Sequence, residues 1–123
     1  MESDLNKHEN LFHIIYSNGQ AAGYSKINLN TPYPLIPSAN VTKLERLYLL
    51  KEFHGLKLGL ALFEFITDFT KKQKQDGLWL FVWIENQRAV SFYKKSGFEI
   101  IGKADFKISE THSNPNHIMF LKY

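Results

Sequence analysis

Two glycines around the start of a predicted helix have the residue type and the spacing of a ligand-binding loop. The stretch from Leu44 to Phe63 reads as a strand, a turn that contains Gly55 and Gly59, and the start of a helix. Glycine has no Cβ, so backbone N–H groups in such a turn can approach a ligand closely. N–H groups at a helix start also attract anions. The stretch predicts either a pyrophosphate-binding loop or an ordinary turn with a glycine at its corner, and alone it leaves both open.

A second stretch with chemical potential, ENQRAVSFYKKSGF, lies about thirty residues later. Asn86 stands where a helix N-cap belongs, and Gly97 stands where a C′ stop belongs. Tyr93 lies between them, and a tyrosine hydroxyl, with a pKa of about 10, can act as a proton donor. One helix face is shared by Ala89, Phe92, Tyr93 and Ser96. This stretch therefore predicts a short helix that carries a phenol.

Periodicity and turn residues predict the elements that position these groups. Asn18-Gly19 is a hairpin signal, the prolines of NTPYPLIPSAN predict a connecting loop, and Asp76-Gly77 is expected to end the first helix. The apolar run LWLFVWI predicts a strand covered on both faces. We expect strands at 11–17, 21–29, 41–50 and 78–84, helices at 58–74 and after Asn86, and two closing strands within 98–108 and 117–123.

This order of elements predicts an α/β fold, with a mixed, mostly antiparallel sheet around one parallel βαβ unit. The length of 123 residues, of which 44% are hydrophobic, predicts a single domain over 1–123 that includes a polar leader, 1–10. The absence of Cys excludes disulfides and a cysteine nucleophile. No apolar run approaches the roughly 18 residues of a membrane span, so we expect no membrane partner and a cytoplasmic location.

The net charge of +3 raises the question of nucleic acid binding. The lysines are dispersed, and the one cluster, KKQK at 71–74, lies at a predicted helix end, where cations complement the helix dipole. We therefore expect no nucleic acid partner. The histidines His13, His54, His112 and His117 lack metal-ligand spacing, so we expect surface or loop positions for them and no metal site.

Together, HGLKLG and ENQRAVSFYKKSGF resemble the GNAT superfamily of acetyl-CoA-dependent N-acetyltransferases. The family's phosphate loop, Q/R-x-x-G-x-G/A, aligns its first position with His54, its central glycine with Lys57 and its last position with Gly59. The second motif, N-x-x-A-x-x-F/L-Y-x-x-x-G-F, is the more specific one and is met in full by Asn86, Ala89, Phe92, Tyr93, Gly97 and Phe98. The resemblance covers about 11–123, and the tail looks most like the spermidine acetyltransferase-like branch.

The sequence departs from the family pattern at two loop positions and at its start. His54 replaces an Arg or Gln, and Lys57 replaces a glycine, although an ammonium beside a phosphate would favour binding. The family's first strand and its two following helices, which usually wall the acceptor site, have no counterpart. The resemblance therefore implies a GNAT-like fold that is shortened at its N-terminus. With that edge bare, we expect a homodimer or a larger assembly in which a second chain covers the strand with Phe12, Ile14 and Tyr16.

The resemblance implies transfer of an acetyl group from acetyl-CoA to an amine such as a polyamine, a small amine or a protein amine. Tyr93 would be the acid that protonates the departing thiolate, and Glu45, on the strand beside the thioester, is the best candidate for the base, although an exposed strand carboxylate is an equally good description of it. Backbone N–H groups of Leu47, Tyr48 and Leu49 could stabilise the oxyanion, and Asn86 would contact the pantetheine arm. The pyrophosphate would lie on His54, Gly55, Leu56, Lys57, Leu58, Gly59 and Leu60. The competing interpretation is a non-catalytic acetyl-CoA-binding or assembly domain.

Overall fold

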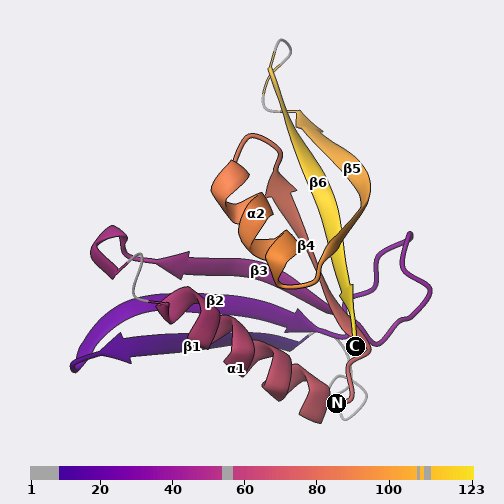
Figure 1. Ribbon diagram of the computed structural model, residues 1–123. Helices are drawn as coiled ribbons and strands as arrows, with labels where there is room; N and C mark the ends of the chain where they lie inside the picture. Colours follow the sequence, from indigo (N-terminus) through magenta and orange to yellow (C-terminus); the bar gives the residue numbers. More distant parts are fainter. Residues whose placement is uncertain (1–8, 54–56, 108, 110–111) are drawn as a thin grey trace.

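The computed structural model describes residues 9–53, 57–107, 109 and 112–123. In chain order its elements are β1 (Glu9–Ser17), β2 (Gln20–Leu29), β3 (Thr42–Leu49), a short 3₁₀ helix (Lys51–Phe53), α1 (Leu58–Lys72), β4 (Gly77–Trp83), α2 (Gln87–Lys95), β5 (Glu99–Lys107) and β6 (Ser113–Lys122). The strands form one sheet in the order β1-β2-β3-β4-β6-β5 (Figure 1). Among the strands of the described residues only β3 and β4 pair in parallel, so the predicted α/β class with one parallel βαβ unit is confirmed.

The sheet opens between its two parallel strands. The ladder between β3 and β4 consists of two residue pairs, Thr42 with Leu78 and Lys43 with Trp79. Beyond Lys43 the strands diverge, while β3 stays paired with β2 as far as Leu49 (Figure 1). The closed end is fixed by hydrogen bonds, since the buried side chain of Gln75 accepts from the hydroxyl of Thr42 at 2.8 Å. The sheet therefore has a V-shaped opening toward the C-terminal ends of these strands.

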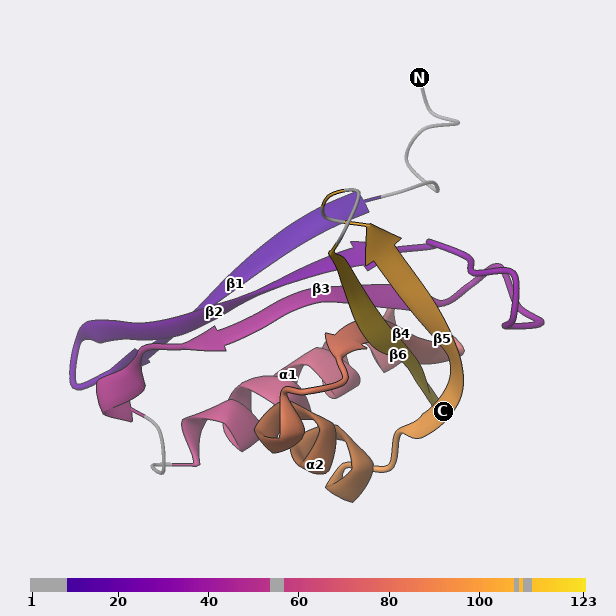
Figure 2. The same cartoon turned by 90° about the horizontal axis from the view of Figure 1, so that it is seen from above.

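Both helices cover one face of the sheet (Figure 2). Strand β4 alternates accordingly: Leu78, Leu80 and Val82 join the core under the helices, and Trp79 joins the second core on the opposite face. The Pro-containing loop 30–41 covers that second face through Tyr33 and Ile36. The prediction that β4 is covered on both faces is confirmed. No helix in the described part of the chain is long and apolar enough to cross a membrane.

The edge strand β1, unlike β4, is covered on one face only. Its residues Leu11 and Ile15 pack against the core under the helices, whereas Phe12, Ile14 and Tyr16 point to the other face and are 62%, 55% and 60% exposed. The hairpin to β2 turns at Asn18-Gly19, both with positive φ (54° and 79°), as the sequence predicts. The sheet therefore carries an exposed apolar stripe at its β1 edge.

Several expectations need correction. Helix α1 ends at Lys72, because Lys74 adopts the left-handed conformation (φ 63°) that stops a helix. Gly77 already belongs to β4, where an added Cβ would collide with the carbonyl oxygen of Leu121. Strand β6 begins at Ser113, four residues earlier than expected.

Two histidines also differ from the expectation of surface or loop positions. His13 lies in β1, half-buried, and packs edge to face on Phe65 and Phe69 of α1, and this burial lowers its pKa. His117 lies half-buried in β6. His112 is exposed, as expected, and His54 lies outside the described residues.

Candidate active site

A pocket of about 710 Å³ lies where β3, the start of α1 and the start of α2 meet. Ligand pockets in proteins commonly have about this size. Its walls are formed by Leu47, Tyr48, Leu49, Lys51, Lys57, Gly59, Leu60, Asn86, Arg88, Ala89, Phe92 and Tyr93. The two stretches that are far apart in the sequence are thus brought to one cavity at the open end of the V.

The start of α1 is built to receive a negative charge. Lys57 is its N-cap and provides no side-chain cap, and the first turn contains no acidic residue. Lys57 has φ 62°, a left-handed conformation that glycine adopts without strain and other residues rarely adopt. Gly59 faces Leu49, and a Cβ added there would lie 3.3 Å from its Cδ1. The first-turn N–H groups and the helix dipole therefore favour an anion here.

Helix α2 contributes an amide cap and a buried phenol. The side chain of Asn86 accepts a hydrogen bond from the N–H of Ala89 at 3.3 Å, so its predicted N-cap role is confirmed. Tyr93 is 9% exposed, and its ring packs against Phe92 and Phe98 with centroid distances of 5.4 and 5.3 Å. Burial raises the pKa of Tyr93 to about 12. The hydroxyl therefore stays protonated, and available as a donor, over the whole neutral range.

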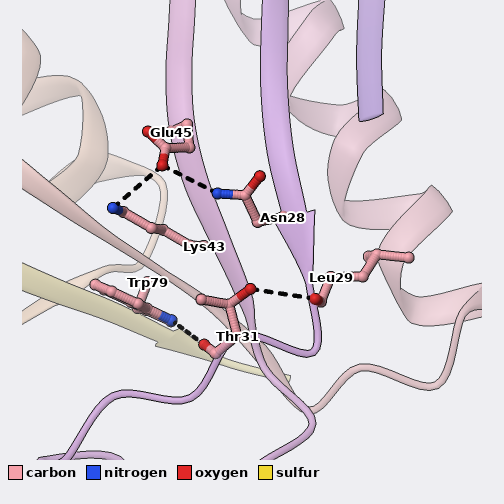
Figure 3. A network of polar contacts seen from close by, with 6 residues as sticks. All are labelled: Asn28, Leu29, Thr31, Lys43, Glu45 and Trp79. Carbon is pink, nitrogen blue, oxygen red and sulfur yellow. Dashed lines mark hydrogen bonds and ion pairs between the residues drawn. The ribbon is translucent and has the colours of Figure 1, made fainter. Parts of the chain in front are cut away.

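Glu45 does not line the pocket. It stands at a bulge in β3, because Leu44 and Arg46 pair with consecutive residues of β2 and Glu45 has no partner in that register. Its carboxylate contacts the Nζ of Lys43 at 3.2 Å and accepts from the Nδ2 of Asn28 at 3.0 Å (Figure 3). The ammonium of Lys43 in turn lies 5.5 and 5.0 Å from the ring centroids of Trp79 and Phe81.

These contacts fix both the direction and the charge of Glu45. Trp79 and Phe81 belong to the face away from the helices, so the carboxylate of Glu45 is held on that face. Burial alone would raise the pKa of Glu45, but the hydrogen bond and charge of Lys43, with smaller contributions from Asn28 and Lys26, lower it overall. The carboxylate is therefore ionised at neutral pH, on the side of the sheet opposite the helices.

Most of the predicted cofactor-binding residues line the pocket: Leu47, Tyr48, Leu49, Lys57, Gly59, Leu60, Asn86 and Tyr93. Leu58 begins α1 but is not part of the lining, and His54, Gly55 and Leu56 lie outside the described residues. Sequence reasoning did not assign Lys51, Arg88, Ala89 or Phe92 to the site. The stretch ENQRAVSFYKKSGF contains the last three, and all three lie within two helical turns of Asn86, which was a usable signal. Lys51 gave no such signal.

No group of three or more metal-ligating side chains is found among the described residues.

Comparison with known proteins gives results that agree with this geometry. A model of the acetyltransferase (GNAT) family matches residues 1–98. An uncharacterised N-acetyltransferase encoded in the pepI 3′ region of Lactobacillus delbrueckii subsp. lactis is 34% identical over 86 residues, which are 70% of this chain and 50% of that protein. The chain thus spans about half the length of the curated relatives it matches.

Solved structures have the same fold. The PaiA N-acetyltransferase of Thermoplasma acidophilum, in complex with coenzyme A, is 27% identical with a TM-score of 0.72, covering 99% of this chain and 65% of that one. A putative streptothricin acetyltransferase of Bacillus anthracis str. Ames, in complex with acetyl coenzyme A, is 22% identical with a TM-score of 0.80, covering 99% and 67%. The latter likeness concerns the fold alone.

Proposed function

We propose, from the premise that this chain belongs to the acetyltransferase (GNAT) family, that it transfers an acetyl group from acetyl-CoA directly to a primary amine. The observation that carries the proposal is the pocket in which the start of α1, the end of β3 and α2 meet. When bound, acetyl-CoA supplies an activated thioester. The chain itself must bind the phosphates, polarise the thioester carbonyl, take a proton from the amine and stabilise the departing thiolate.

The residues of the pocket fit this cosubstrate. The first turn of α1, with Gly59 and without an acid, suits a pyrophosphate. The pantetheine arm would run between the diverging strands past Asn86. The end of β3, at Leu47 to Leu49, is paired with β2 on one side and faces the opening on the other. Its backbone would donate to the thioester carbonyl oxygen, where negative charge develops during attack.

Tyr93 is the proposed donor to the departing sulfur. A thiol has a pKa of about 8.5, more than three units below the value of about 12 that burial gives to Tyr93. Complete proton transfer from this phenol to the thiolate is therefore unfavourable. We accordingly assign to Tyr93 a hydrogen bond that stabilises the developing thiolate. The sulfur departs as the thiolate and takes its proton from solvent.

Glu45 is proposed to act on the acceptor amine. An amine with a pKa of about 10.4 is almost fully protonated at neutral pH and must lose a proton before it attacks. The ionised carboxylate of Glu45 lies on the face away from the helices, across β3 from the pocket. It would begin the path by which the proton leaves on that face. The acceptor would therefore enter opposite to acetyl-CoA, and polyamines, small amines and protein amines are the acceptors to test there.

Calorimetric titration with acetyl-CoA, followed by mass spectrometry of a mixture of amines, tests the proposal. We expect binding and a mass increase of about 42 Da on at least one amine, the mass of an added acetyl group on a balanced transfer. Binding without any acetylated product from polyamines, small amines or peptides would favour the alternative, a non-catalytic acetyl-CoA-binding domain. A protein that is folded by circular dichroism but binds no acetyl-CoA would contradict both.

We also propose that the protein forms a homodimer through β1. The stripe of Phe12, Ile14 and Tyr16 lies on an edge strand, and a second copy that paired antiparallel with this edge would place two such stripes side by side on a continuous sheet. Light scattering across a dilution series should show dimers that the substitution Ile14→Lys separates. A monomer at all concentrations would refute this assembly.

A further inference from the structure

Two cations of the sheet, Lys26 and Arg46, lie directly opposite each other and are called the basic pair below. Lys26 of β2 pairs with Arg46 of β3 in the register of the two strands, and on its other side it pairs with Phe12 of β1. Its ammonium lies 5.6 Å from the ring centroid of Phe12, which is exposed on the face away from the helices. Because directly opposite residues share a face of the sheet, both charges lie on that face, where their repulsion is destabilising.

The charges around the basic pair are unbalanced. Within the described part of the chain, neither Lys26 nor Arg46 forms an ion pair with a carboxylate. Glu45 lies on the same face, but its carboxylate already contacts the ammonium of Lys43 at 3.2 Å and accepts a hydrogen bond from Asn28 at 3.0 Å (Figure 3). Three cations thus share one carboxylate, and two positive charges are in excess. This part of the face therefore favours an anionic group.

The basic pair lies next to the pocket. The adjacent residues on this face are Tyr24 and Tyr48, which are opposite each other with ring centroids 5.7 Å apart. Tyr48 lines the pocket, and it follows Arg46 by two residues, a distance of about 7 Å along a strand. Arg46 also directly precedes Leu47, where the thioester carbonyl would be held. A small molecule whose amine attacks the thioester is therefore long enough to place a second group at the basic pair.

We propose that Lys26 and Arg46 bind an anionic group of the acceptor, so that the acceptor is a small amine that also carries a carboxylate or a phosphate. The inference rests on the proposed function, because it names the class of acceptor that the same site takes. Arg46 suits this role, since a guanidinium can donate two parallel hydrogen bonds to either anion. The basic pair would select the acceptor and take no part in proton transfer. It would disfavour a polyamine, whose further ammonium groups would be repelled.

Rates with three amines of equal length test the inference. β-Alanine, β-alaninamide and 1,3-diaminopropane differ in the anionic, neutral or cationic group opposite the reacting amine. We expect the parent chain to acetylate β-alanine with the highest kcat/KM. Arg46→Gln and Lys26→Gln should lower that value about three- to tenfold, as for a partly exposed charged contact, and leave β-alaninamide unchanged. Arg46→Lys should retain most of the preference. O-Phosphoethanolamine in place of β-alanine distinguishes phosphate from carboxylate.

The chain offers a matched control for the removal of a lysine charge. Lys103 is exposed on β5, at the opposite edge of the sheet from β1. Lys103→Gln should leave all three rates like those of the parent chain, whereas a loss equal to that of Lys26→Gln would show a general effect of net charge and refute the inference. The loss in Arg46→Gln should also shrink as KCl rises from about 50 to about 500 mM, because salt screens the contact.

A nuclear magnetic resonance titration locates the anion without turnover. β-Alanine should shift the backbone amide signals around Lys26 and Arg46 in the parent chain, and β-alaninamide should not. Arg46→Gln should lose these shifts. Shifts confined to other parts of the chain would contradict the inference. Melting temperatures show whether the variants fold: Arg46→Gln removes a like-charged pair and should melt at or above the temperature of the parent chain.

The failure of this inference is distinguishable from the failure of the proposed function. If the parent chain acetylates 1,3-diaminopropane or β-alaninamide in preference to both anionic amines, the basic pair does not select the acceptor, and the proposed function stands. The same holds if Arg46→Gln acetylates β-alanine as fast as the parent chain. If the parent chain neither binds acetyl-CoA nor acetylates any amine, the proposed function itself fails, and the inference with it.

Discussion

Removal of the Tyr93 hydroxyl is the sharpest test of the proposed chemistry, because Tyr93→Phe removes the hydroxyl and keeps the packing of the ring. The ring packs between Phe92 and Phe98, and Tyr93→Phe retains those contacts. No hydrogen bond of the hydroxyl is found within the described residues, so its removal leaves no described group without its hydrogen-bond partner. We therefore expect a folded variant with a free energy of unfolding within about 0.5 kcal/mol of the parent chain.

The expected effect on the rate follows from the charge of the departing sulfur. A hydrogen bond to a charged group contributes about 1.5–3 kcal/mol. Loss of such a bond in the transition state alone lowers kcat by roughly ten- to 150-fold. The KM for acetyl-CoA should change by less than about twofold if the bond forms only as negative charge develops.

The pH dependence gives an independent check. A tyrosine loses its donor function above its pKa, and burial places that value at about 12 for Tyr93. The ratio of the parent and variant rates should therefore stay constant from about pH 6 to pH 10. The assay is the release of CoA thiol at each pH, with Tyr16→Phe as a control, because Tyr16 is exposed on β1 outside the pocket.

Two results would refute this reasoning. An unchanged kcat in Tyr93→Phe would make Tyr93 a structural residue of α2. A parent rate that falls above about pH 9, with the fall absent from the variant, would show that Tyr93 ionises in its ordinary range and that burial does not protect its proton.

Three further predictions follow from the same structure. Gly59→Asp should weaken CoA binding by calorimetry about tenfold or more, and Gly59→Ala only slightly, since the alanine Cβ meets a single side-chain atom at 3.3 Å; an equal loss in both would indicate steric exclusion instead of charge. Glu45→Gln should shift the acidic limb of the kcat/KM profile against pH. Burial would raise the pKa of Glu45, but its contacts with Lys43 and Asn28 hold that pKa below its ordinary value. An unmoved limb would make Glu45 a surface residue. Stability should fall from about pH 10 upward, because burial raises the pKa of Tyr93 and of Tyr123 to about 12 while the unfolded chain ionises at about 10. The fall at pH 11 in urea unfolding should be on the order of 1 kcal/mol for Tyr93 and less for the more exposed Tyr123, and Tyr123→Phe should lessen it.

Local patterns were sufficient to predict the elements and much of the pocket. The hairpin at Asn18-Gly19, the buried strand β4 and the cap at Asn86 depend on residues that are near one another in the chain, and each is confirmed. Eight of the residues expected to bind the cofactor line the pocket, because the two motifs sit at helix starts whose places the βαβ connection determines. Lys51 was missed, since its contribution depends on how the chain turns after β3.

The end of α1 shows where local patterns were insufficient. A glycine is the common residue at the left-handed position after a helix, so Asp76-Gly77 was the natural prediction. The helix instead ends through Lys74, and Gly77 serves the sheet, where the carbonyl of Leu121 and the ring of Phe120 leave no room for a Cβ. The steric demand of a neighbouring strand is a tertiary constraint that has no trace in the residues around position 77.

The opening of the sheet corresponds to a break in the alternation of apolar residues along β3. In β3, Leu44 and Leu47 pack in the core under the helices and Leu49 lies beside Gly59 of α1, so the leucines on this side are spaced by three residues and then by two. Alternation along a regular strand has a spacing of two throughout, so the interval of three requires one inserted residue, and the register places that residue at Glu45. A bulge bends its strand and increases the twist. The bulge lies two residues after Lys43, where the ladder to β4 stops. One inserted residue therefore accounts for two features together: the divergence of β3 from β4, and the return of Leu47 and Leu49 to the pocket side.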